Sequence, residues 1–364
     1  MENKKQNAGR LLKVTVFLSI IFLLFLFFTY LMRNTDYNAR QNVLDFYEEE
    51  NELDVVFIGA SSIYRYWNPM KAWETEGIAT RNYSVSSMHL ATYLPAIKDI
   101  LQTQKPELIV VEARRFSRKS GENAGIEVGA RNMLDSLDYN LSRLKAVHYY
   151  CESMDIPWKD AVSLYIDLIQ YHDNYEALTT ALNWKLADNR IGDEYIEEKN
   201  FKGYALSAKS VAFEDPSENL VDGITELNEN SLMLYDDLLS FCQTNEIPLM
   251  ILAMPMVITE EEAIEINSLK AITASYGVPF VDLNQNFAEL NLDFSTDFLD
   301  AHHVNVLGAD KVTKYLASYL AEEYELEDHR GDAAYASWDE LYEEYSVEAE
   351  KAGTEVKKKI EEEK

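Results

Sequence analysis

Cysteine and positive charge are the two things this sequence has little of. Only two cysteines occur among 364 residues, Cys151 and Cys242, and they lie far apart. Their spacing does not match that of a metal site. Both fall in helix-like segments, which favours small buried hydrophobic side chains, although an extracytoplasmic location would also allow them to form a disulfide.

The shortage of positive charge is larger. Lysine and arginine together number 33 against 63 aspartate and glutamate residues, which gives a formal net charge of -30. A surface of this sign repels phosphate groups, so we expect no nucleic-acid partner and no binding to anionic lipid through charge alone. The hydrophobic share of 47% excludes wholesale disorder, and the length allows one large α/β domain with appendages.

Charge is absent altogether from residues 14–32, which are rich in leucine, isoleucine and phenylalanine. As a helix they would span about 28 Å, close to the hydrocarbon thickness of a bilayer. A cleavable signal peptide is the alternative, but the run is long for one and no small-x-small cleavage site follows it. Residues 1–33 are therefore expected to form a cytoplasmic stub and a signal-anchor transmembrane helix, followed by a polar spacer or short helix over residues 34–52. The basic residues before the helix favour a cytoplasmic amino terminus; they are Lys4, Lys5, Arg10 and Lys13. We therefore expect a single-pass protein of the cell membrane, with the rest of the chain outside the cytoplasm.

Five short apolar runs alternate with helical segments in the rest of the chain. The runs are mostly continuous, which is typical of strands buried on both faces of a parallel sheet. This order predicts an α/β domain over residues 53–325 with a doubly wound, five-stranded parallel sheet. The strands are expected within residues 55–58, 81–90, 108–111, 248–255 and 278–283. The helices are expected at residues 69–80, 91–103, 231–245, 260–276 and 308–323.

Two regions depart from this alternation. Residues 117–230 contain helical stretches, at 131–154 and 158–186, but no clear strand. We interpret this region as a helical insertion, which either forms a lid or substrate platform or only packs on the sheet. Residues 326–364 are acidic, with lysines near the end, and are expected to form a solvated helical or disordered tail.

The first strand ends abruptly in the small residues Gly59, Ala60, Ser61 and Ser62. A Gly-Ser turn with a helix-capping serine is the common structural explanation. The functional explanation is that a serine hydroxyl stands at the carboxyl edge of a parallel sheet, where the ligands of such sheets bind. A pair of residues far downstream favours the functional explanation.

Asp300 and His303 form that pair, three residues apart in a predicted loop over residues 297–305. The carboxylate can hold one imidazole nitrogen, so that the other faces outward as the acceptor that a general base needs. Ser61 would then be the nucleophile, His303 the base and Asp300 the residue that orients it. The neighbouring His302 raises the alternative of a metal site, but adjacent side chains rarely share an ion and no further ligand cluster is visible.

In this order the motifs resemble those of the SGNH (GDSL-like) serine esterase and acyltransferase superfamily, over roughly residues 54–324. Residues 59–61 are similar to its first motif and residues 300–303 to its last, which carries the three roles over. Residues 82–87 resemble the second motif, in which Ser87 stands in place of an oxyanion-hole glycine whose backbone N–H donates. The resemblance implies a three-layer α/β/α, flavodoxin-like fold and no cofactor.

The third family motif, Gly-x-Asn-Asp, has no counterpart in this sequence. The third strand runs instead into Glu112, Ala113, Arg114 and Arg115. Either arginine can replace the missing asparagine as a donor to the oxyanion, bind an anionic group of the substrate, or pair with Glu112.

This variant resembles the membrane-anchored SGNH-like proteins of bacterial envelopes, such as DltD and the alginate-acetylation proteins, which work with membrane-bound O-acyltransferases. The resemblance implies an enzyme that passes an acyl group, above all acetyl, from Ser61 to a cell-envelope polysaccharide or teichoic acid, or to water. The altered motifs favour a catalytically weak assembly factor that binds a glycan or a membrane-bound O-acyltransferase. The intact Ser61, Asp300 and His303 favour the enzyme.

Overall fold

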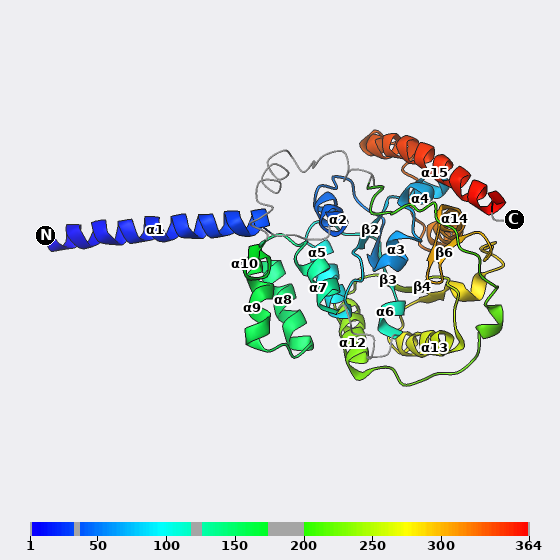
Figure 1. Cartoon of the computed structure of the whole chain (residues 1–364), viewed down its shortest axis with the longest axis horizontal. Coiled ribbons are helices and arrows are strands. Elements are labelled where there is room, and N and C mark those ends of the chain that lie inside the picture. The colour runs from blue at the N-terminus through cyan, green and yellow to red at the C-terminus, as the bar shows by residue number, and fades with distance from the viewer. Residues whose placement is uncertain (1, 33–36, 118–125, 174–199, 363–364) are drawn as a thin grey trace. The chain divides into compact units, whose positions relative to one another are not determined.

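The computed structural model of the chain describes residues 2–32, 37–117, 126–173 and 200–362 (Figure 1). Its contacts divide the chain into two compact units. The first unit comprises Met1–Thr35 and Ile156–Glu197, and the second comprises Asp36–Asp155 and Glu198–Lys364.

Among its described residues, the first unit contains one long helix and two short ones: α1 (Glu2–Met32), α9 (Trp158–Tyr165) and α10 (Asp167–Tyr171). α10 packs against α1. Within α1, Gly9–Thr29 is long and apolar enough to cross a membrane, although a signal sequence or the core helix of a soluble protein would satisfy the same criteria. The predicted apolar helix is therefore present, and its insertion and orientation stay predictions.

The second unit is built around a five-stranded parallel sheet with the strand order β2-β1-β3-β4-β5. Every residue of the first four strands is buried, as expected for strands covered on both faces. The prediction of an α/β domain with five parallel strands is confirmed. The strands are β1 (Val55–Gly59), β2 (Thr80–Ser84), β3 (Leu108–Glu112), β4 (Leu249–Ala253) and β5 (Phe280–Asp282).

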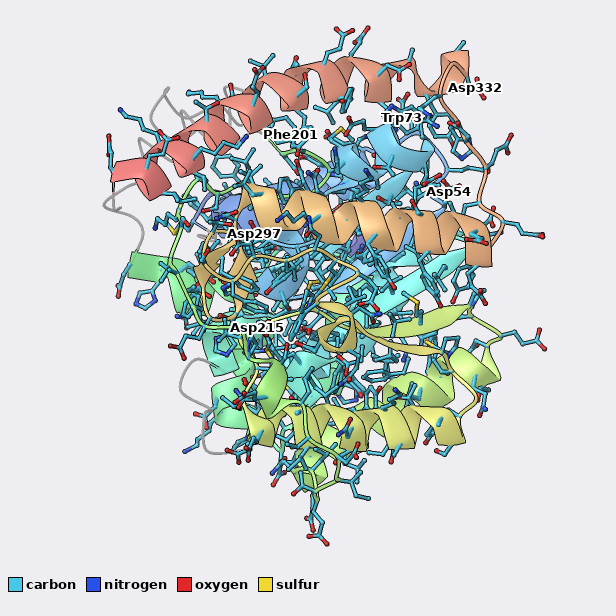
Figure 2. The ribbon with its side chains drawn as sticks, turned by 90° about the vertical axis from the view of Figure 1, so that its right-hand side faces the viewer. Asp54, Trp73, Phe201, Asp215, Asp297 and Asp332 are labelled. Carbon is cyan, nitrogen blue, oxygen red and sulfur yellow. The ribbon has the colours of Figure 1, made fainter. Side chains whose placement is uncertain are left out.

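Helices lie on both faces of this sheet, with the orange α14 above the strands and the yellow α13 below them in Figure 2. α14 packs against α4 on one face, and on the other α6 contacts both α12 and α13. The strands thus lie between two helical layers and end together at one edge. These helices are α4 (Pro69–Glu76) and α14 (Val306–Glu323) on the first face, with α5 (Tyr93–Ile100), α6 (Arg114–Ser117), α12 (Glu229–Thr244) and α13 (Glu260–Ser275) on the second.

Of the two forms expected for residues 34–52, a polar spacer or a short helix, the structure has the short helix: α2 (Tyr37–Tyr47) packs against β2. Asn42 donates its side-chain amide to the carbonyl oxygens of Asn82 at 3.0 Å and Ser84 at 2.9 Å. Strand β2 is at the edge of the sheet, so these bonds satisfy carbonyls that would otherwise be open. α2 therefore belongs to the same compact unit as the sheet.

Among the described residues, the helical insertion expected over residues 117–230 is helical between 126 and 171 and extended from residue 200 on. α7 (Ile126–Leu134) and α8 (Leu141–Ser153) belong to the second unit, whereas α9 and α10 belong to the first. The helical stretch expected at residues 158–186 is confirmed as far as α10. Its remainder, beyond residue 173, lies outside the described residues.

Residues 200–228 correct the prediction, because they form an extended segment with one 3-10 turn at Ser217–Asn219. Three of their backbone N–H groups bond to carbonyl oxygens of distant residues in the unit instead of closing helical turns. A segment whose polar backbone groups are satisfied in this way does not need a helix. The donor and acceptor pairs, each at 2.8 Å, are Ala205 with Tyr64, Val211 with Phe298, and Phe213 with Phe294.

The carboxyl-terminal segment is a packed helix. α15 (Ala336–Glu362) has 27 residues and lies against α4 and α14, as Figure 1 shows. Its buried side chains recur at helical spacing, among them Trp338, Tyr345 and Val356. The expectation of a helix within residues 326–364 is confirmed. The expectation that this helix is surrounded by solvent is wrong, because one side of it is buried. The many acidic residues between these positions make the apolar stripe difficult to recognise in the sequence.

Both cysteines are buried and free, Cys151 in α8 and Cys242 in α12. Burial raises the pKa of the Cys242 thiol to about 12, which suppresses the reactive thiolate at neutral pH. These findings agree with the interpretation of both residues as small buried hydrophobic side chains.

Candidate active site

A sharp turn after β1 places Ser61 at the carboxyl edge of the sheet in the second unit. Ser61 begins α3 (Ser61–Tyr64), a single helical turn that follows closely on Gly59. A Cβ at Gly59 would lie 2.5 Å from Ile63 Cγ1 and 3.1 Å from Glu112 Cβ. Glycine is therefore required for the strand to turn this tightly against its neighbour β3.

Asp300 and His303 approach Ser61 from a small hairpin. Within the predicted loop, β6 (Phe298–Asp300) pairs with β7 (His303–Val304) in antiparallel fashion, with Asp300 opposite His303. Asp300 Oδ1 also accepts from the backbone N–H of His302 at 2.8 Å. An aspartate that binds its own backbone two residues on is typical of a tight turn, so this carboxylate shapes the loop as well as facing the imidazole.

The three side chains form a continuous chain of hydrogen bonds. His303 Nε2 lies 2.7 Å from Ser61 Oγ, and His303 Nδ1 lies 2.9 Å from both carboxylate oxygens of Asp300. A carboxylate only accepts, so Nδ1 carries the proton and Nε2 is left to accept from the serine hydroxyl. Residues 242 positions apart in the sequence are thereby arranged as a nucleophile, a base and an orienting acid.

The surroundings favour neutral His303. Its pKa is lowered, first because burial disfavours the charged imidazolium, and further by the positive charge of Arg114. Asp300 opposes this shift without overcoming it. For Asp300 itself burial raises the pKa, but hydrogen bonds from His303 and from the N–H of His302 outweigh that effect and lower it. At neutral pH the pair is a carboxylate beside a neutral imidazole, which is the state that a general base requires.

A buried carboxylate connects the serine turn to the turn after β3. Glu112 is fully buried and accepts from Ser62 Oγ at 2.6 Å and from the backbone N–H of Arg114 at 3.0 Å. Arg114 Nη1 donates in turn to the carbonyl of His302 at 3.2 Å. We call these four linked residues the Glu112 bridge. It ties together the serine turn, the turn after β3 and the loop that carries the base.

The turn after β2 presents a backbone donor. Ser87 has a φ of 52°, in the left-handed region that favours glycine. Among the described residues its N–H has no hydrogen-bond partner, whereas its carbonyl accepts from Arg115 Nη2 at 3.1 Å. Arg115 Nε donates to the carbonyl of Met88 at 3.2 Å, and the amide of Asn132 donates to that of Ser86 at 3.0 Å. The turn is held by two side chains while its N–H stays available.

Helix α7 reaches this turn only because Gly129 has no side chain. A Cβ at Gly129 would lie 2.0 Å from the carbonyl oxygen of Ser87, closer than real contacts allow. The first helix of the insertion therefore supports the site directly. Nothing in the sequence signals this contact, since Gly129 lies in an otherwise ordinary helical segment.

The structure brings Ser61, His303 and Asp300 together as expected and places Ser87 in the turn after β2. Arg114 and Arg115 both donate to backbone carbonyls of the site loops. Their roles as donors to an oxyanion or a substrate stay predictions. The sequence indicates Glu112 only as a pairing partner for the arginines, and nothing in it predicts the bond between Glu112 and the serine turn. The available signal was a charged residue at the end of an apolar strand.

His302 bonds to α13 instead of joining the triad. Its Nε2 lies 3.3 Å from Glu262 Oε1, and Glu262 also completes a capping box with Thr259. Burial raises the pKa of Glu262, but hydrogen bonds from His302 and Thr259 outweigh it and lower the pKa to about 2. Within the described chain no group of three or more His, Cys, Asp or Glu side chains is placed to hold a metal ion.

A polar cavity of about 760 Å³ lies elsewhere on the second unit, lined by residues of α2, by Arg81 and Lys202, and by the start of α15. No residue of the triad lines this cavity. Its size therefore does not identify the site, which is defined by its hydrogen-bond geometry.

Comparison with known proteins gives no assignment, since no family model and no curated protein matches the sequence.

Proposed function

We propose that this protein is a serine acyl-ester enzyme, in which Ser61 accepts an acyl group and passes it to a hydroxyl acceptor or to water. The observation that carries the proposal is the hydrogen-bond chain from Ser61 through His303 to Asp300. Its position at the carboxyl edge of a parallel sheet is where such sheets bind ligands. The lowered pKa of His303 supports its role as the base.

In the first step Ser61 Oγ attacks the ester carbonyl while His303 Nε2 takes the hydroxyl proton. The bond to the alcohol oxygen then breaks, His303 returns the proton to the departing alcohol, and Ser61 is left acylated. In the second step His303 takes a proton from the acceptor hydroxyl or water, which attacks the acyl carbonyl. The bond between the acyl carbon and Ser61 Oγ then breaks, and His303 returns the proton to Oγ. Asp300 keeps the imidazole oriented and stabilises its charged form in both steps.

Backbone N–H groups are the proposed donors to the oxyanion. One belongs to Ser61 in the turn that begins α3, and the other to Ser87. Removing one donor of this kind from a serine enzyme costs about 3–4 kcal/mol of transition-state stabilisation. Arg114 and Arg115 then act by holding the two loops in place, and the Glu112 bridge takes over the structural part of the missing third motif.

The strand order β2-β1-β3-β4-β5 supports a flavodoxin-like arrangement, because doubly wound sheets of that type have this order. Together with the motifs it supports membership of the SGNH superfamily. We therefore include membership of this superfamily in the proposal.

The apolar helix α1 supports an anchored, extracytoplasmic enzyme. Acyl-CoA is absent outside the membrane, so transfer there needs an acyl group delivered by a membrane protein. We therefore propose that the chain works with a membrane-bound O-acyltransferase and that its acceptor is a cell-envelope polysaccharide or teichoic acid. The competing function is an assembly factor of the same fold that performs no chemistry.

Two measurements on Ser61→Ala test this proposal. Turnover of p-nitrophenyl acetate by the purified full chain should fall at least a hundredfold, because the nucleophile is lost. In cells, ester-linked acetate on the surface polysaccharide should fall as well. Equal turnover in the two proteins, with unchanged surface acetate, would favour the assembly factor instead.

A further inference from the structure

The burial pattern of α1 changes abruptly near its carboxyl end. Every residue from Gly9 to Leu24 is exposed, whereas Phe25 and Leu26 are partly covered and Thr29 is buried. α10 packs against α1, and Figure 1 shows it beside the carboxyl end of the long helix. The contact between these two helices of the first unit is therefore made at the last turns of α1.

The depth of this contact follows from helix geometry. The apolar window Gly9–Thr29 has 21 residues and is about 31 Å long as a helix, against about 30 Å of hydrocarbon in a bilayer. When the window spans the bilayer, Thr29 lies at the hydrocarbon boundary and Phe25 lies about 6 Å deeper. The interfacial layer on each side is about 5–8 Å thick. The part of α1 beside α10 thus lies at the hydrocarbon boundary and just inside it, next to the interfacial layer.

Exposed aromatic and aliphatic side chains on α9 and α10 suit this layer. Trp158, the first residue of α9, is 72% exposed, and its ring lies 5.8 Å from that of Tyr165. Ile169 on α10 is 47% exposed. Tryptophan and tyrosine are enriched where proteins cross the membrane–water interface, because their rings have an apolar body and a polar edge.

The negative charge of α9 and α10 indicates which kind of membrane surface they can bind. Residues 156–173 contain Asp160, Asp167 and Asp173 against the single Lys159. Attraction to anionic lipid is therefore not available, and the burial of apolar side chains is what remains. We infer that α9 and α10 form a membrane-surface element, seated in the interfacial layer of the lipid bilayer beside α1. This inference rests on the membrane span of α1 and is independent of the chemistry at Ser61.

Nitroxide labels on the full chain in phosphatidylcholine vesicles test the inference, in a background of Cys151→Ala and Cys242→Ala. The label is placed at Ile169→Cys, with Val347→Cys as the matched control, because Val347 is an exposed apolar residue of α15 in the second unit. A further label at Leu18→Cys reports whether α1 is inserted. We expect the ratio of oxygen to nickel-chelate accessibility at position 169 to lie several-fold above that at 347 and below that at 18.

Three results would overturn the inference. One is a ratio at position 169 equal to that at 347 while the label at 18 is deep in the bilayer. A second is shielding of position 169 from both reagents, which would indicate a protein contact. The third is a water-accessible label at position 18, which would show that α1 does not span.

Intrinsic fluorescence provides a second readout without a label. Brominated phosphatidylcholine should quench the emission of the full chain, and Trp158→Phe should remove part of this quenching. Addition of phosphatidylglycerol should leave it unchanged within about twofold. Quenching that is identical in the two proteins would contradict the inference. Ser61→Ala should give the wild-type result in both experiments, so a failure here is distinct from a failure of the enzyme proposal.

Discussion

Ser87 holds a left-handed backbone conformation, with φ of 52°, although it has a side chain. The role proposed for it needs only its backbone N–H. Ser87→Gly should therefore retain turnover of p-nitrophenyl acetate within about threefold and raise the free energy of unfolding by about 1 kcal/mol, since glycine adopts this conformation without steric cost. Urea unfolding and kcat measure the two effects. A large loss of kcat in a stable variant would show that the hydroxyl itself takes part.

His303 determines how activity depends on pH. The active form has a neutral imidazole, and the pKa of His303 lies below the ordinary value of 6.5. The value of kcat/KM for the full chain should stay level through neutral pH. It should then fall about tenfold per pH unit once the pH drops below that lowered pKa.

Arg114 provides a matched pair of variants for this profile. Its positive charge helps to lower the pKa of His303, so Arg114→Met should move the fall in kcat/KM to higher pH. Arg114→Lys keeps the charge and should leave the fall near its wild-type position, although both variants alter the hydrogen bond to the His302 carbonyl. The same pH profile in both variants would show that the charge of Arg114 does not affect the pKa of His303.

At this scale the sequence predicts residue types better than contacts. Ser61, Asp300 and His303 could be found because their chemistry and order are distinctive, and the structure places them within hydrogen-bond distance. The partners of Glu112 could not be found, because a bond between Ser62 and Glu112 exists only after β1 and β3 have paired.

Among elements, the five strands were predictable because continuous apolar runs mark strands that are covered on both faces. The packing of α2 against β2, the extended segment over residues 200–228 and the packing of α15 were not. Each depends on tertiary contacts, such as the bond from Asn42 to the edge of β2. The pattern of polar and apolar residues does not predict such contacts.

Two helical glycines separate an effect on the site from an effect on helix stability. Gly129 in α7 packs against the Ser87 turn, whereas a Cβ at Gly353 in α15 would meet only Leu307 Cδ2 at 3.6 Å. Gly353→Ala should therefore stabilise the protein by about 0.5–1 kcal/mol and leave kcat unchanged.

Gly129→Ala should instead displace the Ser87 turn. We expect kcat for p-nitrophenyl acetate to fall at least tenfold, because a donor to the oxyanion moves, while KM changes less. Unfolding curves for both variants provide the control for stability. Wild-type kcat in Gly129→Ala would contradict the placement of the oxyanion donor in this turn.

For the whole molecule, α15 closes the face that begins at α4. Trp338 packs on Trp73 with ring centroids 5.3 Å apart, and the hydroxyl of Tyr345 donates to Asp310 at 3.0 Å. Nearer the carboxyl end of α15, Val356 packs with Val306, the first residue of α14. α14 directly follows the hairpin that carries His303. The acidic end of the chain is therefore part of the fold that holds the site.

Trp338→Ala tests this role. Removing a fully buried tryptophan should lower the free energy of unfolding by about 3–5 kcal/mol, through lost burial and the cavity that remains. Val347→Ala, at a position 63% exposed on the same helix, should change it by less than about 0.5 kcal/mol. Urea unfolding of the full chain in detergent measures both. Equal effects of the two substitutions would show that α15 is not packed as the structure has it.

The central claim is that Ser61 is a nucleophile activated by His303. It is tested most directly by treating the folded full chain with a fluorophosphonate and locating the adduct by tandem mass spectrometry. The account predicts an adduct on Ser61 that forms slowly in Asp300→Asn, because an amide can hold the imidazole in the wrong tautomer. The neighbouring Ser62 is buried and donates to Glu112, so it should not react. An adduct on Ser62, or none on the folded wild-type protein, would contradict the account.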